Sequence, residues 1–149
     1  MKPLEWNDKL IVDNGLIDED HHILLDNINQ FREQVGHFDS SDDAMKILES
    51  LKLYTEQHFG REEELQRVVK FPYREAHHNE HTNLIKKLDS MMAETKDSSG
   101  NYLNTEVGEK IGMLLKGWLF DHVLENDLRM KPYLEEMREL AKKMGRMGR

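Results

Sequence analysis

The middle of the chain carries two pairs of side chains that are suited to binding a metal ion. His58 and Glu62 are four residues apart, and beyond Pro72 His77 and His81 are again four residues apart. Two side chains at this spacing lie about 40° apart around an α-helix, and therefore share one face. Two antiparallel helices packed side by side would bring all four groups to one point. Imidazole nitrogens and a carboxylate that converge inside a protein form a ligand set for a borderline transition metal.

Histidines also interrupt the apolar faces of the segments before and after this region. His21 is in phase with the apolar residues that follow it, and His122 with those that precede it. A single buried histidine is more often a hydrogen-bonded core residue than a ligand. Five in phase on four helices, with Glu62 among them, indicate a buried metal site. A bound cation would also compensate for the cost of burying the Glu62 carboxylate.

Spacing alone does not identify a second carboxylate ligand. Asp127 is five residues beyond His122, which places it about 140° around an ideal helix. Asn126 and Glu125 are alternatives that spacing alone does not separate from Asp127.

The segments that carry these residues are predicted to be amphipathic helices. The acidic run at 18–20 favours the start of the first helix, and Gly36 its end. The cluster at 39–41 (Asp-Ser-Ser) is a capping signal for the second, and Pro72 suits the first turn of the third. A loop is predicted over residues 95–101, and a fourth helix from about Thr105. The apolar residues predicted to be buried are Leu24, Leu25, Ile28, Phe31 and Val35; Ala44, Ile47, Leu48, Leu51, Tyr54 or Thr55, and Leu65; Leu84 or Ile85, Leu88, and Met91 or Met92; and Val107, Ile111, Leu114 or Leu115, Trp118 and Leu119.

Four helices of about 20 residues with short connections predict an all-α, up-down-up-down four-helix bundle. We expect one domain over residues 1–149. It would consist of an extended N-terminal arm (about 1–17), the bundle (about 18–128) and a short C-terminal closing helix (about 132–145). Apolar residues of the arm would lie along the outside of the bundle.

The composition narrows the class of protein. With 29 acidic and 21 basic residues the formal net charge is -8, which argues against nucleic acid or an anionic membrane as partners. Cysteine is absent, which excludes disulfides, thiolate zinc sites and cysteine-ligated iron–sulfur clusters. No apolar segment approaches the roughly 20 residues that a membrane-spanning helix needs. We therefore expect a soluble, cytoplasmic protein.

The order H…HxxxE…HxxxH…HxxxxD resembles the hemerythrin family in its single-domain bacterial form. The resemblance covers nearly the whole chain and includes Trp6, Ile17-Asp18, His58-Phe59, Glu62-Glu63, Pro72 and Trp118-Leu119. It also selects Asp127, which spacing does not. Asp20 departs from the pattern, because a glutamine commonly precedes the first histidine in bacterial members, and it adds negative charge near His21.

The resemblance implies a non-haem di-iron centre that binds dioxygen reversibly, for oxygen storage, delivery or buffering, and implies no enzymatic role. The five histidines would divide between the irons, with His77, His81 and His122 on one and His21 and His58 on the other. Glu62 and Asp127 would bridge both irons together with an oxo or hydroxo group. The first iron would then have six ligands, and the second would keep one position open.

The same resemblance implies that Phe59, Trp118 and Leu119 form the wall of the dioxygen pocket. In a four-helix bundle these residues are equally suited to ordinary core packing. A dry apolar wall would favour a small neutral gas over anions.

Two other functions remain compatible with the sequence. An oxygen or redox sensor that acts through an unidentified protein partner would have the same site. A ferritin-like di-iron oxidase or peroxidase would use Glu-x-x-His pairs, which occur at Glu19–His22 and Glu75–His78, off the apolar faces. By their phase, His22, His37 and His78 are predicted to be surface residues. Glu63 and Glu64 are predicted to belong to a solvated helix face.

Overall fold

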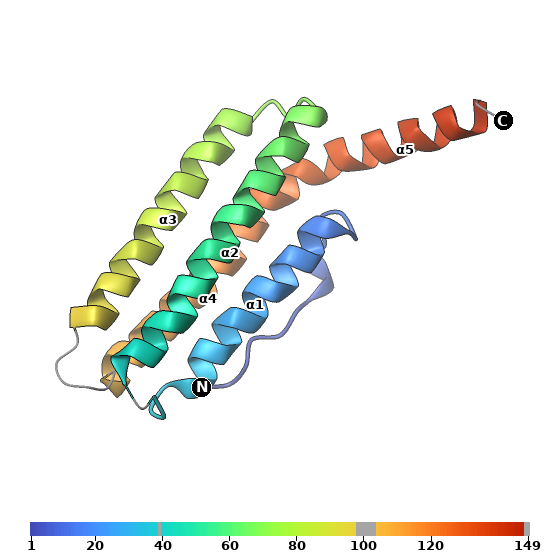
Figure 1. Ribbon diagram of the computed structural model, residues 1–149. Coiled ribbons are helices and arrows are strands. Elements are labelled where there is room, and N and C mark those ends of the chain that lie inside the picture. The colour runs from blue at the N-terminus through green and yellow to red at the C-terminus, as the bar shows by residue number, and fades with distance from the viewer. Residues whose placement is uncertain (39, 98–103, 148–149) are drawn as a thin grey trace.

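Four long helices pack as a bundle in the computed structural model, which describes residues 1–38, 40–97 and 104–147. They run alternately in opposite directions, with α4 behind α2 in Figure 1. Each packs against two neighbours, so that α1, α2, α3 and α4 form a closed ring. The helices are α1 Leu16–Gln34, α2 Ser41–Val68, α3 Arg74–Asp97 and α4 Thr105–Glu125. The predicted all-α, up-down-up-down bundle is confirmed.

The buried faces of the four helices follow the predicted stripes. Where the sequence left a choice, the buried residues are Thr55, Leu84, Met91 and Leu115. Val35, Ile47, Leu65 and Val107, at the ends of the stripes, are partly buried against the core. Each helix keeps a polar face, as expected for the surface helices of a bundle. Across the described ranges, none is both long enough and apolar enough to span a bilayer.

The turn between α1 and α2 uses the predicted signals. Gly36 follows the end of α1 with φ +86°, in the left-handed region that glycine adopts without strain. Ser40 caps α2, and its hydroxyl accepts a hydrogen bond from the backbone nitrogen of Asp43 at 3.4 Å. Asp39, the first residue of the predicted capping cluster, lies outside the described residues.

The start of α1 differs from the prediction. The helix begins at Leu16, and its free backbone N–H groups are met by Asp13, whose carboxylate accepts from Gly15, Ile17 and Asp18 at 2.9–3.1 Å. The carboxylate of Asp18 in turn accepts from backbone nitrogens of the arm at 2.7 and 2.9 Å. Asp20 is buried in the bundle. The cap therefore precedes the acidic run that was expected to supply it.

Two further boundaries differ from the sequence prediction. The third helix begins at Arg74, two residues after Pro72. It continues through Asp97 into the predicted loop, whose residues 98–101 lie outside the described part of the chain. The closing helix, α5, spans Lys131–Met147 and is longer than predicted. It follows a 3-10 turn, η2 (Asp127–Met130), directly, with Pro132 in its first turn, where proline is tolerated.

The arm runs back along α1 before the bundle begins (Figure 1). The backbone of Leu4 exchanges two hydrogen bonds with the side chain of Asn29, at 2.7 and 2.8 Å. A 3-10 turn, η1 (Asp8–Leu10), interrupts the extended chain and packs against α4. Leu10 and Val12 are buried, so the arm forms part of the core that surrounds the site.

Candidate metal centre

The side chains predicted as metal ligands meet in the middle of the bundle. All are buried, and none exceeds 5% exposure. Each of the four helices and η2 contributes: His21 from α1, His58 and Glu62 from α2, His77 and His81 from α3, His122 from α4, and Asp127 from η2.

Glu62 occupies the centre of this group and has no exposed surface. Its Oε1 lies 3.3 Å from Nε2 of His58 and 3.1 Å from Nε2 of His81. The same oxygen is 4.0 Å from Nε2 of His77 and 4.0 Å from Nε2 of His122. One carboxylate therefore faces histidines of α2, α3 and α4 together.

Asp127 is brought to the site by a change in helix type. The α-helical geometry of α4 ends at Glu125, and the chain continues through Asn126 into the 3-10 turn η2. A 3-10 turn has about three residues per turn, so side-chain directions no longer follow the α-helical count from His122. As a result Asp127 points inward, with Oδ1 2.8 Å from His77 Nε2 and Oδ2 2.9 Å from His21 Nε2.

The donors form two groups that share both carboxylates. One consists of Glu62, His77, His81, His122 and Asp127, and the other of His21, His58, Glu62 and Asp127. Within each group one ligand atom per residue lies within 4.8 Å of all the others. Three histidines therefore lie on one side and two on the other, and the two groups, each of which could hold a metal ion, have both carboxylates in common.

Unpaired polar atoms show that the residues fit a cation. Nε2 of His21, His58 and His122, Oε2 of Glu62 and Oδ2 of Asp127 are buried without a hydrogen-bond partner among the described residues. His21 Nε2 and Asp127 Oδ2 lie only 2.9 Å apart, yet are not aligned as donor and acceptor. Unpaired buried polar groups are costly. Metal ions would satisfy these nitrogen and oxygen lone pairs together.

The charges of the site are strongly coupled. Burial opposes ionisation of Glu62 and Asp127, but the surrounding imidazoles hold the pKa of both carboxyls well below their usual values. Burial likewise opposes protonation of His58 and His122, but the carboxylates raise the pKa of His58 to about 9 and that of His122 to about 10. In the metal-free protein two protons thus balance two carboxylates, and bound cations would replace them.

Asp20 contacts the side of the His58 ring that faces away from the site, and the sequence did not predict this contact. Asp20 Oδ2 lies 2.7 Å from Nδ1 of His58. Because an ionised carboxylate only accepts hydrogen bonds, Nδ1 carries a proton, and once the ring loses its second proton Nε2 would present its lone pair to a bound metal ion. Arg61 donates to both oxygens of Asp20 at 2.9 Å, and the hydroxyl of Tyr54 donates to Oδ1 at 2.7 Å. Burial would raise the pKa of Asp20, but these hydrogen bonds lower it well below its usual range.

The negative charge of Asp20 is therefore directed across the helix interface at His58, although Asp20 precedes His21 in the sequence. The sequence does contain a pattern that indicates this contact. Tyr54, His58 and Arg61 follow one another at steps of four and three on α2, so a polar pair flanks the ligand on one face.

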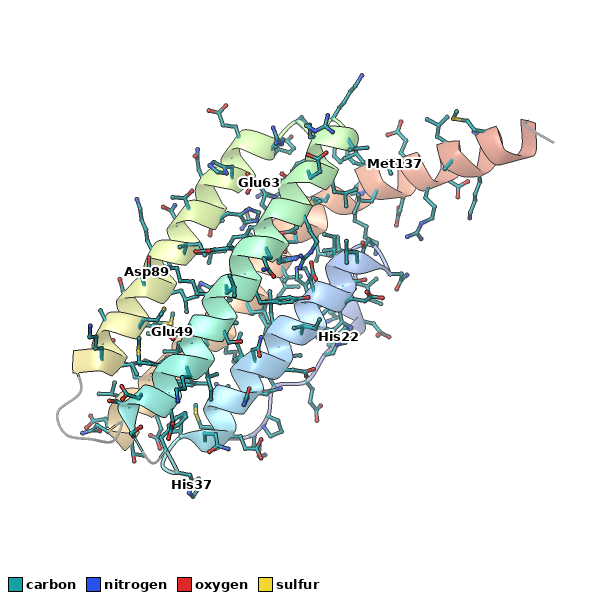
Figure 2. The ribbon with its side chains drawn as sticks, in the orientation of Figure 1. His22, His37, Glu49, Glu63, Asp89 and Met137 are labelled. Atoms are coloured by element: carbon teal, nitrogen blue, oxygen red, sulfur yellow. The ribbon has the colours of Figure 1, made fainter. Side chains whose placement is uncertain are left out.

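Glu63 makes a second contact of this kind and corrects the prediction of a solvated face. It lies where α2 faces α3 (Figure 2), with Oε2 3.2 Å from Nδ1 of His81 and Oε1 2.5 Å from Nδ1 of His78. His81 is thereby oriented with Nε2 toward Glu62. Glu64 is exposed and pairs with Arg67, as expected for a surface residue.

A small cavity adjoins the two-histidine side of the centre. Its volume is about 10 Å³. The lining contains the three predicted pocket residues together with candidate ligands and two leucines that were predicted only as core residues: His21, Leu24, His58, Phe59, Leu84, Trp118, Leu119 and His122. The indole N–H of Trp118 donates to the carbonyl of Leu84 at 2.9 Å, so the polar atom of this wall is satisfied.

The remaining histidines lie outside the centre. His22, His37 and His78 are exposed as predicted, and Figure 2 shows His22 and His37 on the outside of the bundle. Glu19 and Glu75, the acids of the alternative Glu-x-x-His pairs, are also exposed. Neither donor cluster within the described residues includes a member of these pairs. The ferritin-like arrangement is therefore not formed.

Comparison with known proteins agrees with this geometry. Residues 13–134 match the family model described as the hemerythrin HHE cation binding domain. The chain is similar to a bacteriohemerythrin of Campylobacter jejuni, at 24% identity over 89% of this chain and 97% of the relative. It is similar to a bacteriohemerythrin of Stenotrophomonas maltophilia, at 23% identity over 100% of this chain and 95% of the relative.

A solved structure shows the same fold. A crystal structure of a hemerythrin mutant superposes with a TM-score of 0.72 at 20% identity. The match covers 90% of this chain and 98% of that one.

Replacing Asp20 should weaken metal binding. Asp20→Asn removes the charge that holds His58 and leaves Arg61 without its bidentate partner, so we expect a loss of about 10-fold to 100-fold in affinity for ferrous or cobaltous ion. Anaerobic titration against a competing chelator measures this affinity. Asp89→Asn is the control, because Asp89 is exposed and pairs with Lys52 on the surface. Equal affinities in the two variants would show that Asp20 does not position His58.

The metal-free protein should lose stability as the pH rises. The folded pKa values of His58 (about 9) and His122 (about 10) exceed the roughly 6.5 of an unfolded histidine. Their stabilisation is therefore full below about pH 6.5 and is lost as the pH passes through these folded values. Thermal unfolding from pH 6 to about 10 measures it. Metal binding needs neutral imidazoles, so metal-loaded protein should not show this loss. Parallel decreases in the two forms would contradict the assignment.

Proposed function

The chain belongs to the hemerythrin family, and on that premise we propose that it binds dioxygen reversibly at a non-haem di-iron centre. The observation that carries the proposal is the sharing of Glu62 and Asp127 by two groups of buried histidines. One ion would use a single group, whereas two groups with common carboxylates suit two ions held close together.

The proposed ligands divide as the two groups divide. His77, His81 and His122 would hold one iron, and His21 and His58 the other. Glu62 and Asp127 would bind both, together with an oxo or hydroxo bridge. When bound, the irons supply the position at which dioxygen attaches and the electrons that hold it there.

The small cavity supports assignment of the open position to the two-histidine side. Both histidines of that side, His21 and His58, line it. At about 10 Å³ it is at the lower limit for one water molecule and is too small for an organic substrate. Its other walls are apolar apart from His122, and the Trp118 N–H is already bonded to Leu84. Such a space favours a neutral diatomic gas over anions and supports binding over turnover.

A larger cleft between α3 and α4 approaches the same cavity from the surface. Its volume is about 590 Å³, and Leu84, Trp118 and His122 line both spaces. These side chains separate the centre from solvent. Because the Trp118–Leu84 hydrogen bond ties α4 to α3, the wall is held closed and limits entry of water.

We infer that the protein stores, delivers or buffers dioxygen in the cytoplasm. The anaerobically reduced, iron-loaded protein should contain two irons per chain. It should gain a charge-transfer band on exposure to air and lose it on deoxygenation. Analysis that returns one zinc and no iron from iron-replete cells would contradict the di-iron centre. Irreversible oxidation with substrate turnover would instead identify an oxidase or peroxidase.

Truncation of Leu119 should shorten the life of the oxygenated form without removing iron. Leu119→Ala opens the cavity wall and admits water, so the oxygen-dependent band should decay irreversibly faster than in the wild type. The control is Leu115→Ala, because Leu115 is buried on α4 but does not line the cavity. Both substitutions should cost about 2–5 kcal/mol of stability. Iron content and decay of the band are followed on the same samples, and equal decay rates in the two variants would show that Leu119 is core only.

A further inference from the structure

Helix α5 leaves the bundle and extends away from it (Figure 1). Its first turns are anchored: Leu134 is buried, and the ring of Tyr133 meets that of Phe71 edge-on with centroids 5.3 Å apart. The guanidinium of Arg138 donates to the backbone carbonyl of Asp13. From 139 to 145 every residue is exposed. Most of α5 is therefore a helix without a packing partner among the described residues.

One face of this projecting helix is apolar. Met137 (40% exposed), Leu140 (56%) and Met144 (64%) follow one another at steps of three and four, which is the spacing of a helix–helix seam. Figure 2 shows Met137 where α5 leaves the bundle. The match to the family domain ends at 134, so these side chains lie beyond it. A contiguous exposed apolar stripe of this kind is typical of an interaction surface.

Charged side chains flank the apolar stripe. In the first half of α5, Glu135, Glu136 and Glu139 occur with Lys131 and Arg138, and Lys142 and Lys143 follow in the second half. Glu136 and Lys143 are seven residues apart and lie on the same side of the apolar stripe, which has a consequence for pairing.

We propose that α5 pairs with α5 of a second copy of this chain, in antiparallel orientation. Met137 of one copy then faces Leu140 of the other, and Glu136 of one copy faces Lys143 of the other. The two-fold axis repeats each contact, so the assembly closes as a dimer. In a parallel, in-register pair, Glu136 and Lys143 would lie at the same heights in both copies, so Glu136 would not face Lys143. An anionic membrane would meet the three glutamates as well as the lysines, so the charge pattern favours a second copy.

The interface is small, since each copy contributes three exposed apolar side chains. We therefore expect a dissociation constant on the order of micromolar or weaker. Sedimentation velocity of the full chain, from low micromolar to several hundred micromolar protein at low salt, should show a dimer fraction that grows with concentration. A monomer throughout this range would overturn the proposal.

Two sets of variants test the interface itself. Leu140→Glu should abolish the dimer, whereas Leu53→Glu should not, because Leu53 is similarly exposed (60%) but lies on α2. Glu136→Lys and Lys143→Glu alone should each weaken the dimer by about tenfold, since the axis doubles every charge contact. The double variant should restore it. Equal loss in the Leu53 control, no rescue by the double variant, or binding of monomeric protein to anionic vesicles would each exclude the antiparallel pair.

Discussion

Two carboxylates buried at the centre of an apolar bundle are the constraint on which the structure depends. Glu62 and Asp127 have no exposed surface, and ions in such a place are strongly destabilising unless opposite charge compensates them. Protonated His58 and His122 supply that charge in the metal-free protein. Bound metal ions would supply it instead when the histidines act as neutral ligands. Behind two of the histidines lie further carboxylates, Asp20 and Glu63, and behind Asp20 lies Arg61, which reaches solvent. Negatively and positively charged groups thus alternate from the centre of the site to the surface.

The fold supplies the rigid positions that this alternation needs. Ligands four residues apart on α2 and on α3 keep a fixed separation because the helical backbone sets it. Hydrogen bonds to the carboxylates of Asp20 and Glu63 hold the ring orientations of His58 and His81. Apolar layers above and below the centre exclude water and strengthen every charge interaction within it.

The parts of the site that follow helical periodicity were predictable from the sequence. His21, His58, Glu62, His77, His81 and His122 sit on apolar stripes, and the four helices follow from the same pattern. Asp127 does not follow this periodicity, because it lies on a 3-10 turn where the α-helical count no longer applies. Only the family resemblance selected it. The contacts of Asp20 with His58 and of Glu63 with His81 were not predicted, because each joins two different helices and depends on how those helices pack. Helix α5 was also predicted: it begins one residue before its predicted start and ends two residues beyond its predicted end.

The 3-10 turn η2 joins the centre to α5 without an intervening loop. Asp127 is its first residue, and α5 begins immediately after its last, Met130. A helix of 17 residues is about 25 Å long. Contacts of Tyr133, Leu134 and Arg138 fix the first half of α5 to the bundle. The segment that places Asp127 in the centre therefore also sets the direction in which the outer half of α5 projects from the protein.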